Sequence, residues 1–279
     1  PKSPSLMLES LFVDNFRLFK QLQIENFGRV NLIVGENNSG KSALLEAIQV
    51  YASNASPNKL IDLVVSRQES WEKEAQSLEK RVLSNPLRHL FFGHKLPEVN
   101  ERGFRVGKSE NNDSLINLRV EAYRSERQED GSLVRNRVDD ISEEEDLSDV
   151  DLSLISETRG KTRRLVDLDE DLRSPRFRRR LSSRVGIDPN YPFQVVPTGD
   201  IASSRIASLW DATSLTDLED DVISCLKLID SRIERVAFVE DDASKYQSDR
   251  RIPLIKVDGM EEPLPLKSMG DGMSRIFHI

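Results

Sequence analysis

Residues 30–42 read Val-Asn-Leu-Ile-Val-Gly-Glu-Asn-Asn-Ser-Gly-Lys-Ser, and this stretch decides the fold. Its first five residues are mostly apolar, which predicts a short strand buried on both faces. The next eight residues fit the pattern G-x-x-x-x-G-K-[ST] in full. Beyond the pattern, apolar residues recur at helical spacing at Leu44, Leu45, Ile48 and Tyr51. The stretch therefore predicts a strand, a glycine-rich loop and a helix in that order.

The loop has the chemistry of a phosphate site. Glycines at both ends permit backbone conformations that a Cβ would block, so the loop can wrap its N–H groups around a phosphate. The following helix directs the positive end of its dipole to the same anion. Lys41 would bridge the β- and γ-phosphates, and the hydroxyl of Ser42 would ligate Mg²⁺. The predicted nucleotide-binding residues of the loop are Gly35, Glu36, Asn37, Asn38, Ser39, Gly40, Lys41 and Ser42.

The composition excludes several classes of protein. Of the 279 residues, 37 % are hydrophobic, and no apolar run approaches the roughly 18 residues that a membrane span needs. The single cysteine, Cys225, excludes a disulfide scaffold, and three histidines disfavour a His-ligated metal site. Residues 1–5 do not resemble a signal peptide and are interpreted as a cloning remnant, so we expect a cytoplasmic protein. With a net charge of -8, any polyanion must bind to a local patch.

The sequence between residues 6 and 190 predicts several further elements. Strands are expected at 8–16, at 22–24 and at 116–122, where apolar and polar residues alternate. The Asp130-Gly131 pair predicts a hairpin turn into a strand at 133–138. Residues 59–190 as a whole are interpreted as a charged, partly helical insertion. Its features are a helix on Trp71, Ala75, Leu78 and Val82, an acidic run at 143–151 and an arginine-rich run at 173–184.

The last ninety residues predict a regular region again. A buried strand is expected at 193–196, followed by an amphipathic helix with Thr213 or Ser214 as its cap and Cys225 buried in it. The apolar residues of that helix are Leu215, Leu218, Val222, Leu226 and Ile229. Further strands are expected at 236–239, 252–257 and 264–266, and a helix begins near Met273.

Residues 15–19, Asn-Phe-Arg-Leu-Phe, together with residues 30–42 resemble the opening of the SMC, RecF and OLD group of ABC-type ATPases. In that group the first strand carries N-F-[RK]-x-[FH], and the loop is typically G-x-N-[GN]-[SA]-G-K-[ST]. Asn38 replaces the commoner glycine, a variant familiar among OLD-like and RecF-like proteins. The resemblance implies an α/β fold: a P-loop NTPase domain of ABC type over residues 6–279, with an antiparallel β-lobe and the insertion at 59–190.

Residues 266–273, Leu-Lys-Ser-Met-Gly-Asp-Gly-Met, look like the signature segment of the same group, whose core is L-S-x-G. The resemblance implies that Ser268 and Gly270 contact the γ-phosphate of a nucleotide bound by a second subunit. It also implies that Arg17 reaches the phosphates, and that Gln194 or Thr198 serves as the Q-loop residue. From the residues alone, a glycine-rich turn and a surface arginine stay open as alternatives.

Hydrolysis requires acidic groups near Mg²⁺. In this group they follow four apolar residues on a strand after the signature helix, whereas the sequence stops within that helix. We therefore expect a domain that is incomplete at its C-terminus and binds nucleotide better than it hydrolyses it. Residues 236–239 followed by Glu240 and Asp241 imitate the acidic segment but precede the signature, so they are interpreted as a strand that leads into an acidic loop.

The resemblance implies an ATP-binding domain that acts as an ATP-dependent dimerising switch in DNA repair or phage defence. Two copies would form a homodimer that sandwiches two Mg²⁺-bound ATP molecules, with a nuclease or effector as a further partner. DNA is a candidate ligand of the arginine-rich run, and no membrane association is expected. The alternatives are a kinase-type or GTPase-type P-loop protein that uses Glu240 and Asp241 as its Mg²⁺ acids, and a nucleotide-binding module without turnover. The sequence lacks the guanine motif N-K-x-D, which disfavours a GTPase.

Overall fold

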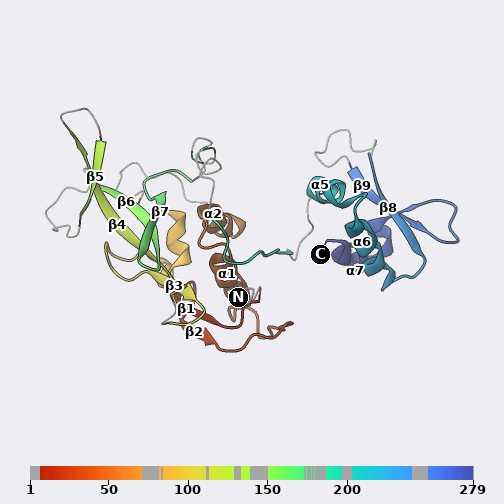
Figure 1. The fold of residues 1–279 in the computed structure, drawn as a ribbon, viewed down its shortest axis with the longest axis horizontal. Helices are drawn as coiled ribbons and strands as arrows, with labels where there is room; N and C mark the ends of the chain where they lie inside the picture. The colour runs from red at the N-terminus through yellow and green to blue at the C-terminus, as the bar shows by residue number, and fades with distance from the viewer. Residues whose placement is uncertain are drawn as a thin grey trace, which may run out of the picture. The chain divides into compact units, whose positions relative to one another are not determined.

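The computed structural model describes residues 7–70, 82, 84–110, 113–128, 133–138, 150–172, 174, 177, 179, 187–196, 203–240 and 251–278. The chain divides into two compact units, Pro1–Phe193 and Gln194–Ile279, here called the first and the second unit (Figure 1). Each unit has a hydrophobic core of its own and is described separately.

The first unit is built on a seven-stranded sheet in which every pair of neighbouring strands is antiparallel. The strand order is β2-β1-β3-β4-β6-β7, and β5 pairs with β4 outside this path. The strands are β1 (Leu11–Phe16), β2 (Phe19–Ile24), β3 (Phe104–Gly107), β4 (Ile116–Arg127), β5 (Leu133–Val138), β6 (Val150–Thr158) and β7 (Lys161–Asp167). Alternation of apolar and polar residues turns one face of β4 to the core and leaves a polar face opposite.

Two helices pack on the apolar face of this sheet, α1 (Lys41–Ala52) and α2 (Pro57–Ser66). Pro57 lies in the first turn of α2, where the missing N–H costs no helical hydrogen bond. The described residues of this unit also form two short 3₁₀ helices, η1 (Pro86–Leu90) and η2 (Phe92–His94). The ring of Phe104 contacts the rings of Phe16 and Phe91 edge to face, each with 5.1 Å between centroids, which adds directional packing to the core.

In its described residues, the second unit contains a three-stranded antiparallel sheet, three α-helices and one 3₁₀ helix. The strand order is β10-β9-β8, with β8 (Ile233–Glu240), β9 (Arg251–Val257) and β10 (Leu264–Pro265). The helices are α5 (Ser203–Thr213), α6 (Asp217–Lys227) and α7 (Asp271–Phe277), and the 3₁₀ helix η5 (Leu266–Met269) precedes α7. Trp210, Phe238 and Phe277 form an aromatic group at the edge of this core, with ring centroids 5.7–6.2 Å apart.

Most predicted elements are confirmed. The strands expected at 8–16, 22–24, 116–122 and 133–138 are present as β1, β2, β4 and β5, and β4 pairs with β5 as the predicted hairpin. The helix after the glycine-rich loop is α1, and the strands expected at 236–239, 252–257 and 264–266 are β8, β9 and β10. The antiparallel sheet of the first unit, with helices packed on it, agrees with the expected α/β fold that contains an antiparallel β-lobe.

Two strand predictions were wrong. Residues 30–34 form no strand, and their side chains Val30, Leu32 and Val34 are 89 %, 87 % and 77 % exposed. Residues 193–196 also lack strand structure, and Phe193, Val195 and Val196 are exposed. A strand buried on both faces needs neighbouring strands to pair with, and no described strand runs beside either segment.

Two details of the helix predicted around Val222 also require correction. The helix starts at Asp217, and its cap is Thr216, whose hydroxyl accepts from the N–H of Leu218, because Leu215 adopts a left-handed φ of 66° that no helix can continue. Cys225 is exposed and not buried. The buried stripe of α6 is narrower than its apolar spacing predicts, since only Leu226 of that helix is fully buried.

The segment 59–190, predicted as an insertion, contributes most of α2 and strands β3 to β7 to the first unit. The helix expected on Trp71–Val82, apart from Val82 itself, lies outside the described residues, and so do most of the acidic and arginine-rich runs. None of the helices in the described parts of the chain is both long enough and apolar enough to cross a membrane.

Candidate phosphate-binding site

The segment Gly35–Ser42, here called the phosphate loop, leads into α1 without a conventional cap. Gly40 occupies the N-cap position with φ 100°, no side chain caps the helix, and the first turn holds no acidic residue. The N–H groups of that first turn therefore have no intrahelical acceptors, and they form the positive end of the helix dipole. Asn38, with φ 64°, adds a second left-handed position, and this backbone is suited to surround an anion.

Lys41 holds its ammonium group against the loop. Its Nζ donates to the carbonyl oxygens of Gly35 at 2.8 Å and Glu36 at 2.6 Å. Ser42 is exposed, and its hydroxyl makes no hydrogen bond to any described residue. A cation over the loop, uncapped N–H groups and an open hydroxyl form the donor set that a nucleotide phosphate with Mg²⁺ requires, so the residues fit this cofactor.

Close packing disfavours a side chain at both glycines of the loop, and at Gly40 a positive φ does so as well. A Cβ on Gly40 would lie 3.0 Å from the ring of Phe19 and 3.1 Å from Cδ1 of Leu18. A Cβ on Gly35 would lie 2.8 Å from Oγ of Ser39. The turn between β1 and β2 thus packs against the start of α1, and a side chain at Gly40 would require Phe19 and Leu18 to shift in addition to adopting a strained φ.

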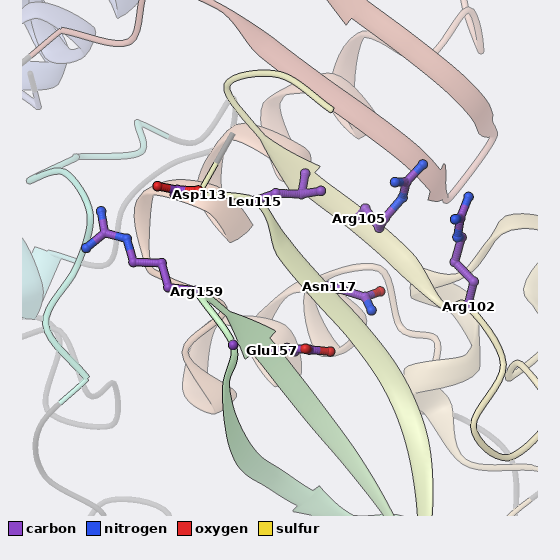
Figure 2. A pocket seen from close by; sticks show the side chains of 8 residues that line it. Arg102, Arg105, Asp113, Leu115, Asn117, Glu157 and Arg159 are labelled. Atoms are coloured by element: carbon purple, nitrogen blue, oxygen red, sulfur yellow. The ribbon is translucent and has the colours of Figure 1, made fainter. Parts of the chain in front are cut away.

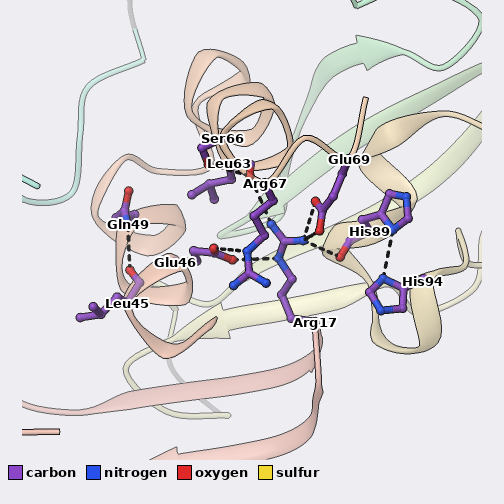
Figure 3. A network of polar contacts seen from close by, with 10 residues as sticks. All are labelled: Arg17, Leu45, Glu46, Gln49, Leu63, Ser66, Arg67, Glu69, His89 and His94. Carbon is purple, nitrogen blue, oxygen red and sulfur yellow. Dashed lines mark hydrogen bonds and ion pairs between the residues drawn. The ribbon is translucent and has the colours of Figure 1, made fainter. Parts of the chain in front are cut away.

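Arg17 lies in that same turn, where its guanidinium bonds to protein groups (Figure 3). Its side chain is 3 % exposed; Nε donates to Glu46 at 2.8 Å and Nη1 to Glu69 at 2.5 Å. Nη1 also donates to the carbonyl oxygen of His89 at 3.1 Å, and Nη2 to that of Leu63 at 3.4 Å. These contacts connect the β1–β2 turn to α1, α2 and η1, whereas the phosphate contact implied for Arg17 stays a prediction.

Sequence reasoning missed the partner of this arginine. Glu46 lies on the buried face of α1 and also accepts from Nε of Arg67 at 2.6 Å, just after the end of α2 (Figure 3). The available signal was an acidic residue at a helix position flanked by the core residues Leu44 and Ala47, because a carboxylate in such a position needs a cation as a partner.

The signature residues lie in the second unit. Ser268 is in η5 and Gly270, with φ 95°, is the N-cap of α7; both are exposed or half-exposed. A Cβ added to Gly270 would have no heavy atom within 4 Å, so only the positive φ favours glycine at this position. The phosphate loop belongs to the first unit and the signature to the second, and the contact implied between two subunits stays a prediction.

The remaining candidate residues acquire little support. Glu240 ends β8, an edge strand that runs antiparallel to β9, and it stands opposite Arg251. Asp241 and Thr198 lie outside the described residues, and Gln194 is exposed in irregular structure. In the described parts of the chain, no three His, Cys, Asp or Glu side chains gather as a metal site, and the role of Ser42 as a Mg²⁺ ligand stays a prediction.

Comparison of the sequence with known proteins finds similarity to ATPases. The family described as AAA ATPase domain matches residues 7–159. A Helicobacter pylori protein named ATP/GTP phosphatase is 23 % identical over 98 % of this chain and 71 % of its own length. A RecF DNA replication and repair protein of Listeria welshimeri is 38 % identical over 27 % of this chain and 20 % of its own length. A Methanocaldococcus jannaschii protein is 43 % identical over 17 % of this chain and 22 % of its own length.

Proposed function

Because the chain belongs to the AAA ATPase domain family, we propose that it binds ATP with Mg²⁺ at the phosphate loop. The observation that carries the proposal is the ammonium group of Lys41, held by the carbonyl oxygens of Gly35 and Glu36 beside the uncapped start of α1. An incoming phosphate would replace these carbonyls as the partner of Lys41 and would accept from the free N–H groups. Ser42 would add its hydroxyl to Mg²⁺.

We propose further that nucleotide binding joins two copies of the protein. In this arrangement the phosphate loop of one copy and the accessible Ser268 and Gly270 of the other contact the same ATP. The γ-phosphate then stabilises the dimer, and its hydrolysis releases the two copies, so that ATP acts as a switch. The accessibility of both signature residues supports this proposal, because a contact in trans requires it.

We propose that the whole protein hydrolyses ATP and that this hydrolysis contributes to DNA repair. The name of the Helicobacter pylori relative supports hydrolysis, and similarity to RecF proteins supports a DNA-linked role. Phage defence, with a nuclease or effector partner, is a second proposed setting that rests on the resemblance of the sequence motifs alone. Glu240 as a Mg²⁺ acid has less support, because its strand is an antiparallel edge strand of the second unit.

The deciding experiment measures nucleotide affinity by calorimetry. We expect the wild-type chain to bind Mg-ATP and the variant Lys41→Ala to lose binding at least about a hundredfold, since Lys41 holds its positive charge directly against the loop. Lys20→Ala is the matched control, because Lys20 is an exposed lysine of neighbouring β2. A wild-type chain that binds neither Mg-ATP nor Mg-GTP would contradict the proposal.

Nucleotide choice and turnover separate the alternatives. The Helicobacter pylori relative is named for both ATP and GTP, so both nucleotides are measured under the same conditions. A strong preference for GTP would favour the GTPase-type alternative. Tight ATP binding with no phosphate release by the longest available form of the protein would favour a binding module without turnover.

A further inference from the structure

The polar face of the first unit's sheet contains a hollow of about 320 Å³ (Figure 2). Phe104 and Val106 of β3 lie in the core, so Arg105 between them points to the opposite face. The same alternation in β4 turns Asn117 away from the core formed by Ile116 and Leu118. The hollow is therefore separated from α1, the helix that follows the phosphate loop, by the thickness of the sheet.

Two arginines that line the hollow have no ion-pair partner among the described residues. Arg102 and Arg159 are exposed and form no ion pair or hydrogen bond with any described residue. Figure 2 shows them on opposite sides, with Asn117 and Glu157 between them. The only lining acid without a described partner is Asp113, so the unpaired groups at the hollow are net positive although the chain carries -8.

The other charged groups of the hollow are already paired. Arg105 donates from Nε to Asp14 at 2.8 Å and from Nη2 to Glu110 at 3.0 Å. Glu157 forms an ion pair with Arg119. These pairs fix the walls, and an added ligand would not need to break them to reach Arg102 and Arg159.

Asn117 presents an unused amide at the base of the hollow. Its Oδ1 is buried and has no hydrogen-bond partner among the described residues. A buried carbonyl oxygen without a donor is unfavourable, and native structures satisfy such groups with water, an ion or a ligand. A bound molecule that carries hydroxyl groups could supply the missing partner to this amide, directly or through a water molecule.

We propose that this hollow binds a small, polar ligand with two anionic groups, of the class of a sugar bisphosphate. One phosphate would contact Arg102 and the other Arg159, while the hydroxyl groups between them would bond to Asn117. The volume lies at the lower end of the range for small-molecule sites, and Leu115 is the only apolar side chain in the lining. Both facts fit a compact, hydrophilic molecule better than an aromatic one.

The test uses the full chain with Lys41→Ala, so that the phosphate loop cannot account for phosphate binding. The probes are a hexose bisphosphate, the monophosphate and the unphosphorylated sugar, measured by calorimetry. We expect saturable binding of the bisphosphate, weaker binding of the monophosphate and none of the sugar. Arg102→Ala and Arg159→Ala should each lower the affinity about tenfold, as loss of a charge-assisted hydrogen bond predicts. Arg235→Ala, an exposed arginine of the second unit, is the matched control and should change nothing.

Two outcomes would overturn the proposal. The first is absence of saturable bisphosphate binding at millimolar concentration, or binding that neither arginine variant weakens, with thermal unfolding used to show that the variants are folded. The second comes from a parallel titration with single-stranded DNA of roughly ten nucleotides. If only the DNA binds, and both arginine variants weaken it, the hollow belongs to a nucleic-acid surface and not to a small-molecule site.

Discussion

Arg17 holds a full positive charge at a position where 3 % of its side chain is exposed. Such a charge is tolerated only when ion pairs and hydrogen bonds replace its hydration. Glu46 and Glu69 provide the ion pairs, and the carbonyl oxygens of Leu63 and His89 accept at the remaining sites. Because Glu46 lies on α1, five residues after Lys41, this network fixes the helix that carries the phosphate loop.

We predict that Arg17→Ala acts mainly on stability. Its removal leaves Glu69 without its cation and Glu46 with Arg67 alone, which should lower the free energy of unfolding by about 3 kcal/mol, the lower end of the range for a broken buried pair. Urea unfolding, followed by a signal from the first unit, measures the change. Arg29→Ala, at an exposed arginine of the same unit, is the control and should stay within about 0.5 kcal/mol. If instead Arg17→Ala leaves stability unchanged and ATP affinity falls, Arg17 is a phosphate ligand.

Gly40 is predicted to tolerate no side chain. Alanine there would have to adopt φ near 100° and would press its Cβ against Phe19 and Leu18. Gly93 has φ 74° and open space around it, so Gly93→Ala isolates the backbone cost of about 1–2 kcal/mol. Gly40→Ala should cost a further 1–3 kcal/mol, roughly, from overpacking and should weaken Mg-ATP binding, because the start of α1 shifts. Equal urea midpoints for the two variants would show that the close approach is absent.

At the scale of the element, β4 shows how ion pairs and hydrogen bonds fix the side chains on the polar face of a sheet. Glu121 is 1 % exposed and accepts from Tyr123 at 2.6 Å, while Arg119 and Arg137 pair with it at 2.8 Å and 3.1 Å. Burial tends to raise the pKa of Glu121, but the hydrogen bonds from Tyr123 and Arg119 and the nearby charges lower it overall. The carboxylate therefore stays ionised and holds three side chains of the polar face together.

Tyr123 is predicted to make stability fall at alkaline pH. Burial and the hydrogen bond to Glu121 raise the pKa of Tyr123 from 10.0 to about 12. The folded state thus holds this proton more tightly, so the stabilisation is complete below pH 10 and is lost between pH 10 and about 12. Ultraviolet absorbance of the phenolates should show late-titrating tyrosines, because burial also raises the pKa of Tyr51, and Tyr123→Phe should remove the late titration near pH 12 that belongs to Tyr123. A late titration that is unchanged in Tyr123→Phe would contradict the prediction.

The predictability of each element depended on whether its pattern was local. Residues 116–122 alternate, and alternation requires only that one face be covered, so β4 was foreseen. Residues 30–34 have the composition of a central strand. Such a strand also needs neighbouring strands to pair with, and composition does not show whether they are present. The helix after the loop, α1, was foreseen for the same local reason, whereas the bonds of Arg17 to Glu69 and His89 join residues more than fifty positions apart and leave no spacing to detect.

At the scale of the whole molecule, the two halves of the proposed site fall in different units. The phosphate loop lies within Pro1–Phe193 and the signature within Gln194–Ile279. In the proposed dimer, the loop would contribute the ammonium group of Lys41 and N–H groups on one side of a phosphate, and Ser268 would contribute a hydroxyl from another surface, beside Gly270, whose N–H donates to the carbonyl oxygen of Lys267 at 3.2 Å. A nucleotide sandwiched in the proposed homodimer would contact both surfaces at once.

This arrangement predicts complementation between two inactive variants. Lys41→Ala removes the loop's contact to ATP, and Ser268→Arg blocks the signature, so neither chain alone should self-associate with Mg-ATP in sedimentation. Mixed together, they can still form one intact site, with the loop of the Ser268→Arg chain and the signature of the Lys41→Ala chain. We therefore expect ATP-dependent dimers in the mixture, weaker than those of the wild type because one of the two nucleotides is missing. A wild type that binds ATP and stays monomeric would reject the sandwich, and a mixture that stays monomeric beside a dimeric wild type would show that the loop and signature do not meet in trans.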